Sequence, residues 1–239
     1  DHNEATLSMS YLKFDRRLMA NLDESTQREY IRTNRKGAYC CSSIVGCNTR
    51  KYHGVLVIPV PELSENNHVL LSSLDLTIVQ HGVPFNVGIH EYEGDIFSPK
   101  GHKYIREYNV DIASSTTYRV GGVVLQKEFL FCHYTNRMLQ RYTLLEAHSR
   151  TTLRLSPFLA FRDVKMLTHR NDQYHGDYGQ AKSGVTFCLY PGYPTLYLQL
   201  SKAHNFVSDP HWNERIEYIK ERERGYEYTE DLYVPGYFE

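Results

Sequence analysis

Residues 117–129 read TYRVGGVVLQKEF and indicate the fold class. Two runs rich in β-branched and aromatic side chains flank the dipeptide Gly121-Gly122. A two-residue link of this kind favours the primed turns, whose twist matches that of antiparallel strands. The sequence therefore predicts a β-hairpin here.

Period-two alternation recurs further along the chain. Residues 153–161, LRLSPFLAF, place four apolar side chains and Pro157 on one face, which we expect to be buried. Pro157 has no amide hydrogen, so we expect it at an edge, a bulge or a strand end. Residues 185–190 and 195–201 form another predicted strand pair, joined by a tight Pro-Gly turn.

Three segments do not alternate in this way. Residues 22–32 are predicted to contain a short helix with Asp23 or Ser25 as its N-cap, and residues 213–224 are charge-dense and helical by propensity. Residues 171–183 are polar and glycine-rich, which indicates a long surface loop.

The predicted architecture is an all-β sandwich of two stacked antiparallel sheets. We expect the 239 residues to form a single domain, 1–239, because the sequence contains no repeat, linker or low-complexity tract. A domain of this size buries roughly 70–75% of its unfolded surface, which is enough for an independent core.

Composition makes several partners poor candidates. The 27 Lys and Arg residues balance 28 Asp and Glu residues, so no overall field favours nucleic acid or an anionic membrane. No apolar run approaches the roughly 18–20 residues that span a bilayer, and the N-terminus lacks the apolar segment of a secretory signal. The five cysteines form no C-x-x-C pair, so a reducing cytoplasm fits best, with the thiols as small buried side chains.

Motifs for metals and cofactors are not found in the sequence. The 12 histidines include His169 and His175, whose spacing matches no metal site, and we expect both to lie exposed in a loop. The chain has no nucleophile elbow, dinucleotide cradle or Walker loop. We expect neither a metal nor a cofactor.

Carboxylates suited to glycoside hydrolysis are not identified by their spacing. That chemistry needs two carboxyl groups facing each other across a sugar. Glu230 and Asp231 are consecutive, so on a strand they point to opposite faces. Asp163 follows Arg162, and these two residues either form a structural ion pair, cap a loop or hold a sugar hydroxyl.

Tyrosine is abundant, with 20 copies against a single tryptophan. Its ring offers an apolar face and a hydroxyl that together suit carbohydrate, and it is equally favoured on half-buried sheet surfaces. We assign most of the tyrosines to packing.

Several segments resemble one family. Residues 29–39, EYIRTNRKGAY, and 46–54, GCNTRKYHG, are similar to the start of the N-terminal domain of glycogen debranching enzymes of the bacterial and archaeal type. The likeness continues through residues 99–104, 155–163, 168–171, 223–225 and 230–238. The family pattern has a glycine after the Asn34 position and two glycines before Tyr39, where this chain has Arg35 and Ala38.

The resemblance implies a fold and a role. It implies a β-supersandwich of the galactose-mutarotase-like type that packs against a C-terminal barrel of α-helical hairpins. That barrel carries the catalytic carboxylates, and we expect it downstream and absent from this chain, which by itself would be inactive. The complete enzyme would be an amylo-α-1,6-glucosidase that hydrolyses branch linkages of glycogen-like glucans.

The resemblance also implies candidate site residues, none of them catalytic. Residues 48–53, NTRKYH, precede an apolar strand and would form a loop at the sandwich edge that either braces the barrel or reaches its sugar cleft. Arg50 would suit a bidentate grip on a carboxylate of the barrel, and Tyr52 or His53 would contact sugar or backbone. The full substrate-binding or interdomain set is Asn34, Arg50, Tyr52, His53, Arg162, Asp163, Glu230 and Asp231.

Two other functional classes stay open. A stand-alone carbohydrate-binding protein would bind glycogen as the isolated chain. A sugar epimerase on a similar sandwich would show mutarotase activity, and sandwiches host unrelated activities.

Overall fold

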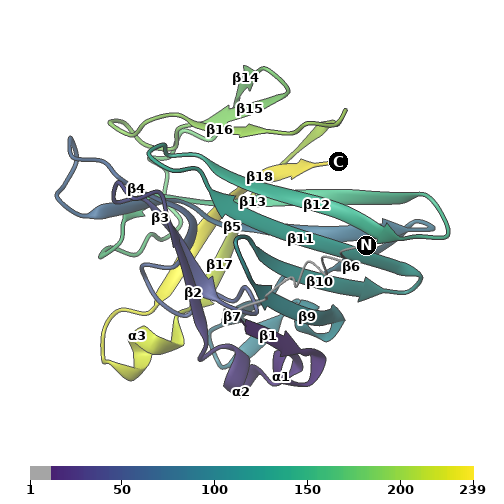
Figure 1. The fold of residues 1–239 in the computed structure, drawn as a ribbon. Helices are drawn as coiled ribbons and strands as arrows, with labels where there is room; N and C mark the ends of the chain where they lie inside the picture. Colours follow the sequence, from purple (N-terminus) through teal and green to yellow (C-terminus); the bar gives the residue numbers. More distant parts are fainter. Residues whose placement is uncertain (1–11) are drawn as a thin grey trace, which may run out of the picture.

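A computed structural model describes residues 12–239, so residues 1–11 of the expected 1–239 domain lie outside the described part. Antiparallel strands form a five-stranded sheet, a ten-stranded sheet and a small three-stranded sheet. Figure 1 shows the five-stranded sheet lying across the larger one. The predicted all-β sandwich is confirmed, with a third sheet that the sequence did not indicate.

The five-stranded sheet has the order β1-β9-β10-β11-β12. Its strands are β1 (Leu12–Asp15), β9 (Ile105–Val110), β10 (Ser114–Val120), β11 (Val123–Phe131) and β12 (Met138–Glu146).

The ten-stranded sheet has the order β2-β3-β4-β5-β13-β18-β17-β7-β8, with β6 paired to β5. Its strands are β2 (Glu29–Thr33), β3 (Tyr39–Ser43), β4 (Gly54–Pro59), β5 (Asn67–Gln80), β6 (Val83–Asn86), β7 (His90–Tyr92), β8 (Ile96–Ser98), β13 (Thr151–Asp163), β17 (Phe206–Glu217) and β18 (Thr229–Phe238).

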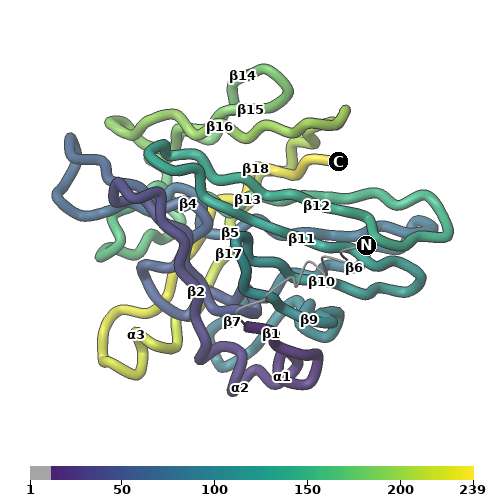
Figure 2. Tube along the Cα trace, viewed as in Figure 1, coloured from purple at the N-terminus to yellow at the C-terminus, as the bar shows by residue number. Residues whose placement is uncertain are grey.

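The small sheet has the order β14-β15-β16 and lies at one end of the sandwich, at the top of the view in Figure 2. Its strands are β14 (Gly179–Ala181), β15 (Gly184–Phe187) and β16 (Leu196–Gln199). The predicted pair 185–190 and 195–201 forms β15 and β16, which pair with each other as expected. Helices are short: α1 (Arg16–Ala20), α2 (Leu22–Ser25), the 3-10 helix η1 (Gly101–Tyr104) and α3 (Ile219–Glu223).

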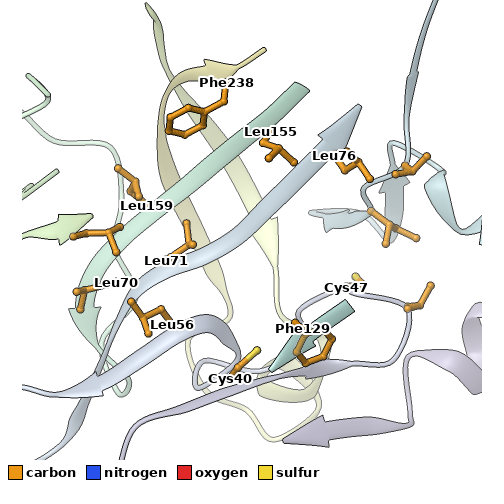
Figure 3. Close-up of a cluster of buried hydrophobic side chains, with 14 of the residues drawn as sticks. Cys40, Cys47, Leu56, Leu70, Leu71, Leu76, Phe129, Leu155, Leu159 and Phe238 are labelled. Carbon is orange, nitrogen blue, oxygen red and sulfur yellow. The ribbon is translucent and has the colours of Figure 1, made fainter. Parts of the chain in front are cut away.

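One hydrophobic core fills the space between the two large sheets. It joins residues of both, such as Phe129 of β11 and Leu155 of β13, and it also takes in Phe187 of the small sheet. Figure 3 shows Leu71, Leu155 and Phe129 within this cluster.

The hairpin read from residues 117–129 is present as β10 and β11. Val120 pairs with Val123, so Gly121 and Gly122 form the two-residue link. Gly121 has a φ of 56°, a conformation that costs a glycine little. The local sequence is therefore sufficient to specify this hairpin.

β13 is a central strand, and the side chains on its two faces belong to two different apolar clusters. Leu159 and Phe161 belong to the core between the sheets, as predicted. Pro157 pairs with Leu74 of β5, and it lies where the pairing of β13 with β18 is interrupted between Leu155 and Leu159. Of the three expected positions, an edge, a bulge or a strand end, the structure has an interruption of the ladder within the strand, which suits a residue without an amide hydrogen.

The opposite face of the ten-stranded sheet carries a second apolar cluster. Its members are the buried residues Val57, Val69, Phe158, Ala160, Ile216, Tyr218, Leu232 and Val234. Side chains alternate along a strand, so Phe158, Ala160 and Arg162 of β13 point to this outer side. The same alternation places Glu230, Leu232 and Val234 of β18 together.

The helix predicted over residues 22–32 is wrong for its second half. Only Leu22–Ser25 is helical, its N-cap is Asn21 in place of Asp23 or Ser25, and residues 29–33 form β2. β2 pairs with β3 along its whole length. Pairing with the next strand along the chain overrides a weak helical preference here.

The helix predicted over residues 213–224 is also partly wrong. Its first residues belong to β17, and only Ile219–Glu223 is helical. The predicted loop at 171–183 is confirmed for residues 171–178, after which β14 begins.

The described cysteines are free thiols, and three of them are buried, as expected for small apolar side chains. Burial raises the pKa of Cys40, Cys41 and Cys47 to about 12, so these thiols stay protonated and unreactive at neutral pH.

The turn before β3 explains one departure from the family pattern. Arg35 occupies the position after Asn34 and has a φ of 63°. This left-handed conformation costs an ordinary residue about 1–2 kcal/mol and glycine almost nothing.

We predict that Arg35→Gly stabilises the chain by about 0.5–1 kcal/mol, because relief of the left-handed backbone exceeds the added entropy of unfolded glycine. Lys36→Gly is the matched control, since Lys36 is equally exposed and does not have a positive φ. It should lose about 0.5–1 kcal/mol in the same urea denaturation. Equal destabilisation by both variants would contradict the assignment.

Candidate functional site

The loop of residues 48–53, between β3 and β4, lies at a polar corner of the ten-stranded sheet. The end of β13, β2 and α3 contact this loop through the hydrogen bonds described below, and the start of β18 is joined to it through Arg162.

A buried ion pair forms the centre of this corner. Arg162 Nε lies 2.5 Å from Glu230 Oε2, and Arg162 Nη2 lies 3.0 Å from Glu230 Oε1, which makes the contact bidentate. The two side chains are 4% and 0% exposed. Arg162 and Glu230 are therefore removed from solvent and available only to each other and to nearby donors and acceptors.

Glu230 accepts two further hydrogen bonds. Tyr218 donates its hydroxyl to Oε1 at 2.6 Å, and the amide of Thr168 donates to Oε2 at 2.9 Å. Burial raises the pKa of Tyr218 well above its ordinary value, so this hydroxyl remains a donor. Burial alone would lower the pKa of Arg162, but the charge of Glu230 outweighs it and raises that pKa.

Arg162 also connects the ion pair to the loop. Its Nη2 donates to the carbonyl of Lys51 at 2.9 Å, and its Nη1 donates to the carbonyl of Asp163 at 3.2 Å. One guanidinium group thus joins β13, β18 and the loop of residues 48–53.

Glu29 of β2 holds the other end of the loop. It accepts from His53 Nε2 at 2.7 Å and from Arg50 Nε at 2.7 Å. The amide of Thr49 donates to His53 Nδ1 at 2.9 Å, which fixes the neutral ring with its proton on Nε2. Burial correspondingly lowers the pKa of His53.

The hydrogen bond from His53, followed by contact with Arg50, lowers the pKa of Glu29 from 4.5 to about 2 against the opposing effect of burial. Glu29 is therefore ionised across the neutral range. The resemblance implies that Arg50 binds a carboxylate of the catalytic barrel. In the structure, Arg50 instead forms an ion pair with Glu29 of its own domain.

Helix α3 and strand β5 complete the support of the loop. The amide of Lys220 donates to the carbonyl of Thr49 at 3.1 Å, and the amide of Lys51 donates to Glu221 Oε1 at 3.3 Å. Asn48 donates through Nδ2 to the carbonyl of Ser72 at 3.0 Å.

Asp163 points away from the ion pair and caps the following turn. It accepts from the amide of Lys165 at 2.9 Å, from the Ser64 hydroxyl at 2.8 Å and from Asn66 Nδ2 at 3.1 Å. Burial alone would raise the pKa of Asp163, and these donors together lower it. Arg162 and Asp163 were expected to pair with each other, to cap a loop or to hold a sugar hydroxyl. In the structure Asp163 caps a loop, and Arg162 forms its ion pair with Glu230.

Asp231 also binds backbone groups. Its two oxygens accept from the amides of Arg215 and Arg170, each at 2.9 Å. Its neighbour Glu230 binds Arg162 instead, as expected for consecutive residues that point to opposite faces.

Asn34 lies apart from this corner and organises its own turn. It is 1% exposed, accepts from the amides of Lys36 and Ala38 at 2.7 and 3.0 Å, and donates to the carbonyl of Thr135 at 2.8 Å. These bonds link the turn before β3 to the turn between β11 and β12.

A basic aromatic patch covers the outer surface of the corner. We define it as Arg50, Lys51, Tyr52, Arg224 and Tyr226. Lys51 and Arg224 each lie 5.0 Å from the ring centre of Tyr226, and Arg50 lies 5.7 Å from that of Tyr52. Tyr52 is 37% exposed and Tyr226 is 52% exposed, and Arg224 is exposed while Arg50 and Lys51 are half-buried, so the patch presents two rings and one cation to solvent.

Three important residues were not identified from the sequence. Glu29 lies in residues 29–39, a segment that resembles the family, and nothing else in the sequence indicates its role at the site. Glu221 lies 170 residues from Lys51, whose amide it binds, and Tyr218 reaches the site by binding Glu230. Sequence spacing cannot indicate such contacts.

Histidines His169 and His175 are exposed, as predicted. His169 Nε2 lies 2.7 Å from Glu227 Oε1. No helix among residues 12–239 is long and apolar enough to cross a membrane.

Comparison with known families identifies the domain. The family model described as glycogen debranching enzyme N terminal matches residues 28–239. The match covers most of the chain, so the chain belongs to this family and contains the N-terminal domain of a glycogen debranching enzyme. Comparisons with curated proteins and with solved structures give no match.

Removal of Arg162 should destabilise the domain strongly. We predict a loss of about 3–5 kcal/mol for Arg162→Ala, because Glu230 would remain buried without its charge partner. The matched control is Arg154→Ala, which breaks the exposed pair of Arg154 with Glu239, each 37% exposed. That control should lose less than about 1 kcal/mol in urea denaturation. Similar losses of unfolding free energy in the two variants would contradict the prediction, because the buried pair would then stabilise the domain no more than an exposed pair does.

Acid should weaken the corner through Glu29. A carboxylate whose pKa is lowered by folding stabilises the protein fully above its ordinary pKa, and this contribution is lost as the pH falls toward the folded value. We predict that Glu29→Gln flattens the loss of stability between pH 4.5 and about 2. Glu62→Gln, a change at an exposed loop carboxylate, should leave the pH dependence as it is. An unchanged curve for Glu29→Gln would refute the role of Glu29.

Proposed function

We propose that this domain does no acid–base chemistry itself and supports a catalytic domain of helical hairpins that hydrolyses α-1,6 branch linkages of glycogen-like glucans. The proposal includes residues 1–239 as one supporting domain, working in the cytoplasm. It rests on membership of the debranching-enzyme family and on the state of the polar corner.

The observation that carries the proposal is that the carboxylates of the corner already accept hydrogen bonds within the domain. Glu29, Asp163, Glu230 and Asp231 each accept hydrogen bonds from groups of the same domain. A glycosidase acid and its partner must instead face a sugar and exchange protons with it or with water. These four groups therefore act as structural anchors.

The basic aromatic patch is the surface proposed to brace the catalytic domain. The bonds from Arg162, Glu29 and α3 fix the loop beneath it, so the rings and cations are held in a defined arrangement. Aromatic and arginine side chains on a rigid base are favoured at the centres of protein interfaces. Tyr226 is the most exposed ring of the patch and its best candidate anchor.

Glucan contact is a second candidate role, at a different place. A shallow hollow is lined by Tyr174, Tyr178 and Tyr233 together with Asp172 and Asp177. Rings beside carboxylates suit the apolar face and the hydroxyls of a sugar. Binding of glycogen to the isolated chain is the direct measure of this role.

The bracing role is tested by comparing two proteins. We predict that Tyr226→Ala lowers the thermal midpoint of the complete enzyme and leaves that of the 239-residue chain nearly unchanged, because an interface anchor costs more than about 1 kcal/mol only where its partner is present. Tyr197→Ala is the control, since Tyr197 is 60% exposed on the small sheet, outside the patch. It should affect neither protein.

Two outcomes would reject this function. Equal effects of Tyr226→Ala on the complete enzyme and on the chain would place the patch outside any interface. Release of sugar from branched glucan by the purified chain, or mutarotase activity in it, would give the domain chemistry of its own.

A further inference from the structure

A second group of acidic residues lies near α3, whose Arg222 contacts two of its members. Glu91 belongs to β7, Asp95 to the turn between β7 and β8, and Glu217 to the last position of β17. One carboxylate oxygen from each of the three lies within 4.8 Å of the others. Three separate elements thus bring negative charge to one point.

Glu217 is the unusual member of this group. It is 0% exposed, and neither of its oxygens has a hydrogen-bond donor among residues 12–239. Glu91 beside it is 4% exposed. A buried carboxylate costs several kcal/mol of folding free energy unless positive charge and hydrogen-bond donors compensate it, so the charges around Glu217 decide whether a further positive partner is needed.

Arg222 supplies part of the charge. Its Nη1 lies 2.5 Å from Glu217 Oε1, without hydrogen-bond alignment, and its Nη2 lies 3.1 Å from Asp95 Oδ1. One guanidinium group offsets one of three carboxylates, and Glu223 adds further negative charge nearby.

We propose that Glu91, Asp95 and Glu217 bind a hard divalent cation, with Ca²⁺ as the best fit. Ligand oxygens at about 2.3–2.6 Å from one ion lie at most about 5 Å apart, and the three carboxylates meet this condition. Asp95 is exposed and provides access for the ion and for water ligands. Ca²⁺ accepts a flexible set of oxygen ligands that includes water, whereas Mg²⁺ requires a nearly regular octahedron.

The bound ion would add a link between the β7–β8 hairpin and β17. The two already meet through the pair Ile216 and Tyr92, through the amide of Glu93, which donates to the carbonyl of Arg215 at 2.9 Å, and through Asn213 Nδ2, which donates to the Tyr92 hydroxyl at 2.8 Å. A cation shared by the hairpin and Glu217 would fix this hairpin against the corner where α3 begins. Because α3 also supports the loop of residues 48–53, the ion would stabilise that loop as well.

Calcium titration of the chelator-treated 239-residue chain tests the proposal by calorimetry and thermal denaturation. We expect saturable binding of one Ca²⁺, a thermal midpoint that rises by several degrees at saturating Ca²⁺, and weaker binding of Mg²⁺. Glu217→Gln should abolish both the binding heat and the shift. Glu93→Gln removes the same charge from an exposed position on the same hairpin, and it should preserve both.

A cluster in which Glu91 keeps its proton while Arg222 pairs with Glu217 is the rival arrangement. It predicts no saturable heat and no shift with Ca²⁺, together with a pH-dependent stability around neutrality that Glu217→Gln reduces. That result would overturn the proposal. Equal loss of Ca²⁺ binding in Glu93→Gln and Glu217→Gln would also overturn it, because it would indicate diffuse attraction to acidic surface.

Discussion

The buried ion pair between Arg162 and Glu230 organises the polar corner of this domain. Two opposite charges in a dry environment are stable only when their remaining hydrogen-bonding groups are satisfied. Tyr218 and the amide of Thr168 satisfy Glu230, and the carbonyl of Lys51 satisfies Arg162. The pair therefore links two strands, the residue before α3 and the loop of residues 48–53.

The alternation of β13 explains why the pair lies where it does. Leu159 and Phe161 fill the space between the sheets, so Ala160 and Arg162 must face outward. The outer side is covered by a second apolar cluster, which excludes water from the ion pair. One strand thus contributes both to the core of the sandwich and to the polar corner on its outer side.

Local features of the fold were predictable from the sequence. The Gly121-Gly122 hairpin and the bulge at Pro157 depend on neighbouring residues, which the sequence displays directly. The helix expected to continue through residues 29–32 fails because β2 pairs with β3, a contact that no local preference describes. The left-handed Arg35 was visible only as a departure from the family pattern.

The site was harder to predict for the same reason. The resemblance pointed to Arg162, Glu230 and residues 48–53 but not to their contacts. Arg162 lies 68 residues from Glu230 and 111 residues from Lys51 in the sequence. The acidic group at Glu91 and Glu217 gave no signal at all, since its members are far apart and individually ordinary. Residue type and spacing find candidates, and only the folded arrangement shows which charges neutralise each other.

Hydrogen exchange in Arg162→Lys measures the organising role of the ion pair. Lysine keeps the charge but cannot bridge Glu230 and the Lys51 carbonyl in the same planar geometry. Faster exchange confined to residues 48–53 and 164–168, with the β10–β11 hairpin still protected, is the predicted result. Unchanged protection of residues 48–53, or an equal loss of protection across the whole sandwich, would contradict it.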